Sequence, residues 1–290
     1  METRWLYRTS EDFHELRRAA KDVCVIPMGC VEKHGLHDPV GLDILKISHL
    51  AYEASKLETV CVFPDFTFGD VPGICTPAGT ITLPLETEML LLEQLCEQIA
   101  RNGYRKILIV DGHGGNRAWL SAFMRNLKNK RRDFVLAVTR TPKGAPRSLA
   151  EVLLEKGSGS IPELTPEDEA LMLRLYEEKV VDGHAGMSET AYMMGICPES
   201  VHLDKLGIES GLSTHVADYF MENGISILND GWDYNYPNSY HGADPVGCNE
   251  RIGRAAVRLG VEALAKRYKL FKEDENLWRW LQHDQNGANV

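Results

Sequence analysis

Short apolar runs alternate with longer stretches of helical periodicity through the first half of the chain. Consecutive apolar residues, bounded by Gly, Pro or charged residues, predict strands at 23–28, 60–63, 106–110 and 134–138. Between these runs, apolar residues recur at spacings of three and four, which predicts helices at 43–57, 86–102 and 116–127. Strands that alternate with crossover helices pair in parallel, so the pattern predicts an α/β fold.

The second half of the chain is less regular. Residues 142–166 are rich in Gly, Pro, Ser and charge, and we interpret them as an excursion from the core that contains a helix at 149–156. Apolar periodicity predicts three further helices, at 167–180, 189–196 and 249–268. The tail after residue 271 is polar except for Leu277, Trp278, Trp280 and Leu281, which we expect to dock on the body or on a neighbouring subunit. Without repeats or low-complexity tracts, we predict one domain over 1–290, with a core at about 20–268 and a tail at 269–290.

Composition excludes several classes of partner. The formal net charge of −10 argues against a nucleic-acid or anionic-membrane partner, because both need a basic face. The seven cysteines form no Cys-x-x-Cys pair, and we expect most of them to be buried thiols in a reducing compartment. Neither a signal peptide nor a membrane-spanning apolar stretch is evident, so the prediction is a cytoplasmic protein that acts on a small molecule.

Three polar clusters follow or flank the apolar segments. They cover 29–39 together with Asp43, 111–116, and 182–190. Ligand sites in open α/β sheets lie at the carboxyl ends of strands, so the first two clusters are expected at one edge of the sheet. Glu32 and His34 are two residues apart, which places both side chains on one side of an extended backbone.

Each cluster also has a simpler interpretation. Asp43 can be an ordinary helix-start carboxylate, the glycine-rich 111–116 segment can be an anion-binding turn, and His184 and Glu189 can be turn and cap residues. Together, however, the carboxylates and imidazoles form a mixed oxygen and nitrogen donor set. Such a set suits Zn²⁺, Mn²⁺ or Fe²⁺ better than a thiolate site, and none of the cysteines is predicted to take part.

The ordered set of motifs resembles the creatininase (creatinine amidohydrolase) family. The matching segments are Glu32-Lys33-His34-Gly35-x-His37 with Asp43 nine residues after His34, Gly79-Thr80-Ile81-Thr82-Leu83, Asp111-Gly112-His113-Gly114-Gly115-Asn116, His184-Ala185-Gly186-x-x-Glu189-Thr190, and more weakly Gly242-Ala243-Asp244-Pro245 with Glu250 and Gly253. They span about residues 23–260, which is most of the chain.

The resemblance implies a one-domain, three-layer α/β/α fold with a mostly parallel sheet, and a divalent metal centre, usually of two ions. It implies an amidohydrolase in which metal-activated water cleaves a C–N bond of a cyclic or linear amide, in a homo-oligomer that is often a hexamer. Some members draw a carboxylate from the position of Gly115, so Glu189 becomes the candidate fifth ligand and a catalytic residue. The implied metal ligands are thus Glu32, His34, Asp43 as the bridge, His113 and Glu189, with His184 as the catalytic histidine. His37 matches a further family histidine, expected just outside the ligands and counted with the substrate-binding residues.

Two departures bear on the substrate. The family often has His-x-x-Phe-Pro-Gly-Thr, whereas Ile74-Cys75-Thr76-Pro77-Ala78-Gly79-Thr80 lacks that histidine, and Val180 and Val181 stand where creatininase proper has an aromatic residue. Both argue against creatinine itself. Family relatives also include hydrolases of formamides, of a redox peptide and of oxidised inositol rings. An oxidised inositol or sugar ring opened at a C–C bond, and a non-catalytic metal or small-molecule binding protein, therefore remain alternatives; a serine hydrolase is disfavoured because no Gly-x-Ser-x-Gly elbow occurs.

An aromatic segment at 232–241 has two interpretations. It can be a Pro-containing surface loop whose aromatic residues pack inward, which we slightly prefer. It can instead be a substrate wall, in which Tyr240 or His241 forms a hydrogen bond to the substrate.

Overall fold

A four-stranded parallel sheet forms the centre of the computed structural model, which describes residues 1–73 and 76–286. Its strands are β1 (Val23–Met28), β2 (Cys61–Val62), β3 (Lys106–Asp111) and β4 (Val135–Arg140). Their order across the sheet is β2-β1-β3-β4, and all three pairings are parallel. The predicted α/β class with a parallel sheet is confirmed.

The strands are apolar at nearly every position because helices cover both faces of the sheet. Along β1, Val23 and Val25 face one core, while Cys24, Ile26 and Met28 face the other. This alternation repeats along β3, and it explains why the strands read as continuous apolar runs rather than as alternating patterns.

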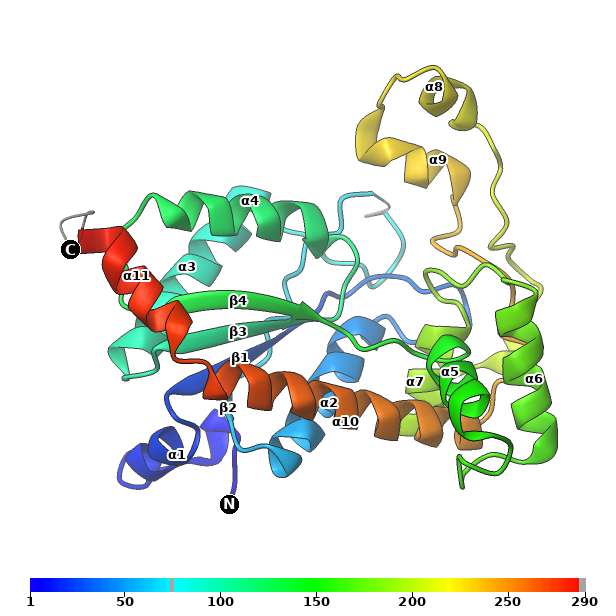
Figure 1. Ribbon diagram of the computed structural model, residues 1–290. Coiled ribbons are helices and arrows are strands. Elements are labelled where there is room, and N and C mark those ends of the chain that lie inside the picture. The colour runs from blue at the N-terminus through cyan, green and yellow to red at the C-terminus, as the bar shows by residue number, and fades with distance from the viewer. Residues whose placement is uncertain (74–75, 287–290) are drawn as a thin grey trace.

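Two helical layers enclose the sheet (Figure 1). One holds α3 (Leu85–Arg101) and α4 (Asn116–Lys128), with the short α1 (Phe13–Ala19) contributing Leu16 to the same core. The other holds α2 (Leu42–Leu57) and α10 (Glu250–Glu273), which pack against each other. The layers confirm the predicted three-layer arrangement.

Helix α7 (Met187–Ile196) packs against α10, and a glycine from each helix lies at the contact. A Cβ atom on Gly195 would overlap the backbone of Gly253, and a Cβ on Gly253 would overlap the backbone at Gly195. The two glycines thus allow the helix backbones to touch, which fixes α7, and the His-Ala-Gly turn before it, against the core.

Most predicted elements are present, with ends shifted by a few residues. The excursion after β4 holds the predicted helix as α5 (Arg147–Lys156), followed by α6 (Pro166–Glu177). Elements with weak or short patterns were missed; they are α1, the 3-10 turns Trp5–Tyr7, Pro198–Ser200, Leu203–Lys205 and Leu228–Gly231, and the helices α8 (Asp218–Glu222), α9 (Trp232–Asn235) and α11 (Asn276–Asn286).

The C-terminal tail is more ordered than the sequence suggested. Helix α10 continues past the expected end of the core, to Glu273, and buries Phe271. In α11, Leu281 joins the core and Trp278 packs against it, as expected for docking on the body, whereas Leu277 and Trp280 are exposed.

Residues 212–236, which we call the arm, project from the body and carry α8 and α9 (Figure 1). Exposed apolar side chains are concentrated here; they are Leu212, Val216, Tyr219, Phe220, Met221, Ile225, Leu228 and Tyr234. Leu228 is the most exposed of these side chains, at 82%.

Burial agrees with the expected role of the cysteines. Of the six in the described residues, all but the half-buried Cys197 are buried, and none is in a disulfide. Cys75 lies outside the described residues, as does Ile74 of the segment that lacks the family histidine. Within 1–73 and 76–286, no helix combines the length and the apolar character needed to cross a membrane.

Candidate metal centre

The first two polar clusters meet where β1 and β3 end, against the first turn of α2. The close approach of these strand ends to α2 needs a glycine directly after each strand. A Cβ on Gly29 would lie 2.6 Å from the backbone nitrogen of Ile44, and one on Gly112 would lie 2.8 Å from the backbone oxygen of Asp43. Asp43 in α2 and Glu189 in α7 each stand in the first turn of a helix, where the helix dipole stabilises a carboxylate.

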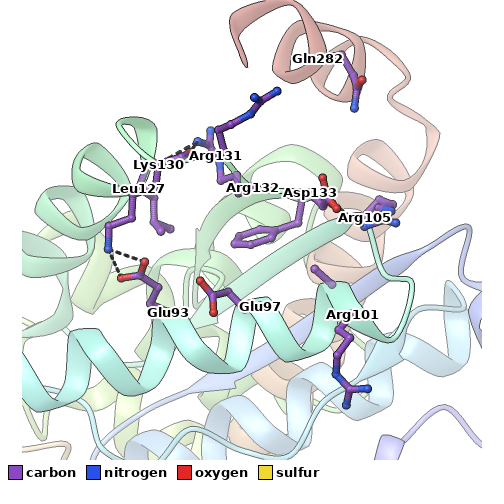
Figure 2. A pocket seen from close by; sticks show the side chains of 12 residues that line it. Glu93, Glu97, Arg101, Arg105, Leu127, Lys130, Arg131, Arg132, Asp133 and Gln282 are labelled. Atoms are coloured by element: carbon purple, nitrogen blue, oxygen red, sulfur yellow. Dashed lines mark hydrogen bonds and ion pairs between the residues drawn. The ribbon is translucent and has the colours of Figure 1, made fainter. Parts of the chain in front are cut away.

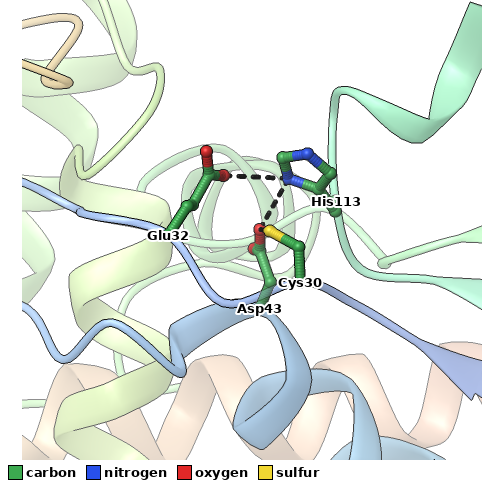
Figure 3. Close-up of side chains that lie close together, drawn as sticks. All are labelled: Cys30, Glu32, Asp43 and His113. Atoms are coloured by element: carbon green, nitrogen blue, oxygen red, sulfur yellow. Dashed lines mark hydrogen bonds and ion pairs between the residues drawn. The ribbon is translucent and has the colours of Figure 1, made fainter. Parts of the chain in front are cut away.

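His113 joins the two clusters. Its Nδ1 lies 2.8 Å from Asp43 Oδ2 and 2.9 Å from Glu32 Oε1 (Figure 3). Its Nε2 lies 2.8 Å from the carbonyl oxygen of Asp70. A side chain on Gly115 would overlap both that carbonyl and the His113 ring, so the structure leaves no room here for the carboxylate that some family members carry.

The loop that presents His113 is braced by polar side chains within the same motif. Asp111 Oδ1 accepts hydrogen bonds from the His113 backbone N–H and from Asn116 Nδ2. Asn116 Oδ1 in turn accepts the backbone N–H of Asp70, the residue whose carbonyl holds the His113 ring. These roles of Asp111 and Asn116 were not predicted from the sequence.

His34 faces three carboxylates that it does not hydrogen-bond. Its Nδ1 lies 3.1 Å from the Glu32 carbonyl oxygen, which leaves Nε2 for the centre. Nε2 lies 3.9 Å from Glu32 Oε1, 3.8 Å from Asp43 Oδ2 and 3.6 Å from Glu189 Oε2. His34 Nε2 is buried without a hydrogen-bond partner, whereas Glu32 Oε1 has His113 Nδ1 at 2.9 Å. Buried polar atoms are rarely left without a partner, and the state of His34 Nε2 fits an atom that binds an ion.

Lys46 is a buried cation that the sequence analysis did not single out. Its Nζ lies 2.8 Å from Asp43 Oδ1 and 3.0 Å from Glu189 Oε1. Lys46 therefore binds the outer oxygen of each carboxylate, and the inner oxygens face His34. Glu189 Oε2 also accepts the Ala185 backbone N–H at 2.8 Å, which ties α7 to the His184 turn.

Opposite charges keep these groups ionised. Burial alone would raise the pKa of Glu32, but the rings of His184, His113 and His34 lower it to about 2. Burial also opposes ionisation of Asp43, yet Lys46, His113 and His34 hold its pKa well below the usual range. Burial would lower the pKa of Lys46, but Asp43 and Glu189 raise it above the usual value. Anionic oxygens of this kind are ready to bind a cation.

His184 comes from the third cluster and reaches the same place. Its ring stacks on His34 at a centroid distance of 3.9 Å. Nε2 lies 2.8 Å from the Lys33 carbonyl oxygen, and Nδ1 lies 3.7 Å from Glu32 Oε1. The structure thus brings together all six predicted ligands and catalytic residues, Glu32, His34, Asp43, His113, His184 and Glu189.

Three overlapping groups of these side chains have the spacing of metal ligands, with donor atoms within 4.8 Å of one another; they are Cys30/Glu32/Asp43/His113, Glu32/His34/His184 and His34/Asp43/Glu189. Glu32, His34 and Asp43 each belong to two of the groups, and Asp43 is the one shared by the first group and the third. Cys30 is the unexpected member, because the sequence analysis excluded all cysteines from the centre.

Two predicted substrate-binding residues, His37 and Tyr240, lie inside the protein. His37 is buried, and its Nε2 lies 2.9 Å from the Ala185 carbonyl oxygen, so it supports the His184 turn from behind. Tyr240 is also buried, and its hydroxyl donates to Asp244 at 2.7 Å. Both polar groups already have partners inside the protein, which the sequence alone did not show.

The rest of the aromatic segment lies beside the centre rather than far from it. Trp232 contacts the His184 ring edge to face, with centroids 5.5 Å apart. His241 donates its backbone N–H to the His184 carbonyl, and its ring packs on Tyr236. Trp232, Tyr236 and Tyr240 are thus packed inward, as we preferred, whereas Tyr234 is exposed. Part of the packing is against the predicted catalytic histidine.

A cavity of ≈ 290 Å³ adjoins the centre on the side of α7 and β4. Its lining includes His113, Lys46 and Glu189 of the centre, together with Arg140, Lys143 and Ser188. A larger cavity of ≈ 580 Å³ lies at the other end of the sheet, where Arg105 and Phe134 precede β3 and β4 (Figure 2). It contains none of the candidate metal ligands, so the smaller cavity is the one relevant to their chemistry.

Comparison with known proteins agrees with this geometry. Residues 7–268 match the family model Creatininase, described as creatinine amidohydrolase. Creatinine amidohydrolase of Pseudomonas putida is 24% identical over 203 residues, which cover 67% of this chain and 72% of that protein.

Solved structures share the fold over nearly their whole length. A provisionally assigned creatinine amidohydrolase from Bacteroides fragilis NCTC 9343 has a TM-score of 0.69 at 26% identity, covering 94% of this chain and 98% of the other. A mutant creatininase of Zn-Zn type has a TM-score of 0.69 at 18% identity, covering 94% and 100%.

Proposed function

The chain belongs to the creatininase family and is therefore a hydrolytic enzyme, and we propose that it is a divalent-metal-dependent amidohydrolase that cleaves a C–N bond of a cyclic or linear amide. We further propose that Glu32, His34, Asp43, His113 and Glu189 hold two ions, of Zn²⁺, Mn²⁺ or Fe²⁺, with Asp43 between them. The Zn-Zn type of the similar creatininase supports two ions.

One observation carries this proposal. His34, His113 and His184 each place one ring nitrogen near a backbone carbonyl oxygen and direct the other towards buried carboxylates. A carbonyl that accepts the outer N–H fixes the ring and leaves the inner lone pair free, which is the usual arrangement of metal-binding histidines. His34 Nε2, which is buried without a hydrogen-bond partner, fits the same explanation.

The residues around the ligands suggest how the reaction is organised. Bound divalent ions supply Lewis-acid activation of water and of a substrate carbonyl. Lys46 keeps the outer oxygens of Asp43 and Glu189 occupied, so that their inner oxygens stay directed at the centre. His184, with Nε2 beside the Lys33 carbonyl, has Nδ1 available to move a proton to the leaving nitrogen, and Glu189 holds its turn through Ala185.

The surroundings favour a small polar substrate. The cavity of ≈ 290 Å³ has Arg140 and Lys143 on its lining, and Trp232 forms an aromatic surface against His184. We propose that the substrate contacts these groups and His241 rather than Tyr240. Creatinine is not expected to be the best substrate, because Val180 and Val181 replace the aromatic residue of creatininase proper.

The test is a screen of metal-loaded enzyme against cyclic amides, formamides and oxidised inositols, with metal content measured in parallel. We expect hydrolysis of an amide, its loss with a chelator, and recovery on adding Zn²⁺ or Mn²⁺. Ring opening of an oxidised inositol without amide turnover would contradict amide hydrolysis and support the alternative, hydrolysis of a C–C bond. Protein that binds no divalent metal would contradict the metal-dependent mechanism.

We also propose that the chain is a single domain and that it forms a homo-oligomer, with the hexamer as the candidate form. Both ends of the chain support one domain, because α1 and α11 contribute to the cores on the same sheet. The arm supports self-association, because an extended apolar surface of this kind is typical of a subunit contact.

Replacing Tyr219 and Leu228 of the arm with Ser is expected to lower the molar mass in light scattering to that of the monomer. The matched control is Leu270→Ser, which changes an apolar side chain that is 75% exposed on α10. A wild-type protein that is already monomeric, or an arm variant that keeps the wild-type mass, would show that the arm is not the contact.

A further inference from the structure

We propose that Cys30 supplies a thiolate ligand to the ion held by Glu32, Asp43 and His113, and that this ligand makes one half of the centre selective for Zn²⁺ over Mn²⁺. The inference rests on the proposed metal-dependent function and adds to it a ligand and a metal preference.

The first argument is geometric. Cys30 Sγ lies 3.4 Å from Asp43 Oδ2, and the four donor atoms lie within 4.8 Å of one another (Figure 3). In a tetrahedral zinc site, a sulfur at about 2.3 Å and an oxygen at about 2.0 Å from the ion lie about 3.5 Å apart. The thiol donates a hydrogen bond to Asp43 over this distance, and the same separation suits two ligands of one ion once the thiol proton is released.

The second argument comes from the neighbours of the thiol. Glu32 Oε1 in the same group is buried, and its close neighbour is His113 Nδ1 at 2.9 Å, an atom that would itself bind the ion. The far nitrogen of His113 lies beside the Asp70 carbonyl, so its Nδ1 is directed at this position. With the thiolate, this half of the centre has four protein donors, one sulfur, one nitrogen and two oxygens.

The backbone holds Cys30 in place. Gly29 before it packs against the first turn of α2, and the backbone N–H of Gly29 donates to Phe66 at 3.0 Å. Cys24 and Cys61, by contrast, lie in the apolar core between the sheet and α3. Among the cysteines in the described part of the chain, Cys30 alone belongs to a group with metal-ligand spacing.

A thiolate changes which ion is preferred. Soft sulfur ligands favour Zn²⁺, whereas oxygen ligands suit Mn²⁺. Binding replaces the S–H bond by a metal–sulfur bond and releases one proton to solvent, so that no oxidant or reductant is needed. The other half of the centre, with His34, Asp43 and Glu189, has only nitrogen and oxygen donors and lacks the additional preference for Zn²⁺ that sulfur gives.

The spectrum of the Co²⁺-substituted enzyme tests the ligand directly. Wild-type protein is expected to show a thiolate-to-cobalt charge-transfer band in the near ultraviolet. Cys30→Ser is expected to lose this band while keeping the visible bands of bound Co²⁺. Cys248→Ala, which alters a buried cysteine outside the ligand groups, is the control and should keep the band.

The possible failures are distinguishable. Wild-type protein that binds Co²⁺ without the charge-transfer band, or a Cys30→Ser variant that retains it, would overturn the role of Cys30 and leave the metal hydrolase intact. Protein that binds no Co²⁺, Zn²⁺ or Mn²⁺ would overturn the proposed function itself.

Competition between metals tests the selectivity. At equal free Zn²⁺ and Mn²⁺, elemental analysis should find the wild-type Zn/Mn ratio lowered in Cys30→Ser. Loss of an outer partner of a metal ligand typically costs about 10- to 100-fold in affinity, so we expect loss of a ligand to lower the ratio at least about ten-fold. An unchanged ratio would contradict the metal preference.

Discussion

Asp43→Asn is expected to strip the purified protein of divalent metal and to lower amide hydrolysis at least about 10³-fold, since the activation of water depends on the bound ions. Asp43 is shared by two of the ligand groups, and its Oδ2 lies within 4 Å of His34 Nε2 and His113 Nδ1. An amide keeps the size of the side chain but removes the negative charge. It also leaves the buried Lys46 ammonium with Glu189 as its remaining carboxylate partner.

Metal content, activity and thermal stability of this variant should be measured together. Asp168→Asn is the matched control, because Asp168 is a buried carboxylate that pairs with Arg251 between α6 and α10. Removing its charge should cost stability but leave the bound metal unchanged. A folded Asp43→Asn variant with full metal content and full turnover would contradict the assignment of Asp43 as the shared ligand.

His184→Gln is expected to lower kcat by about 10²- to 10⁴-fold while the metal content stays at the wild-type level. A role in proton transfer must be distinguished from a role in metal binding, because His184 lies close enough to Glu32 and His34 to be a ligand as well. All the proposed metal ligands remain in place in this variant, so an effect on proton transfer should appear in kcat alone. His215→Gln, which alters an exposed histidine of the arm, is the control and should change neither quantity.

Single-turnover kinetics and elemental analysis separate the two roles of His184. Loss of one ion per subunit in His184→Gln would make His184 a ligand and not the proton-transfer group. A His184→Gln variant with wild-type turnover and full metal content would show that His184 takes no part in the reaction.

Long, strongly periodic elements were predictable because their burial is set by local spacing. The strands β1 and β3 and the helices α2, α3 and α10 follow directly from it. Helices α8 and α9 were not predictable, because a short helix with exposed apolar residues has no amphipathic pattern. The end of α10 was not predictable either, because its last turn is fixed by Phe271 packing on the core.

The candidate site was predictable where its residues directly follow the ends of strands. Glu32, His34 and His113 follow β1 and β3, and parallel strands bring such residues to one edge. Lys46 and Cys30 could not be assigned from sequence, because a lysine one turn into a helix and an isolated cysteine usually have ordinary structural roles. Only the distances to Asp43 distinguish them. Likewise, His37 and Tyr240 had suitable chemistry, but their internal hydrogen bonds were not visible in the sequence.

The most direct test of the metal centre is anomalous diffraction from crystals of the metal-loaded enzyme, recorded above and below the absorption edge of the metal. We predict two peaks, both within ligand distance of Asp43, one of them among Glu32 and His113 and the other among His34 and Glu189. The absence of a peak at Asp43 in protein that carries metal would contradict the central claim that these buried side chains form the metal centre.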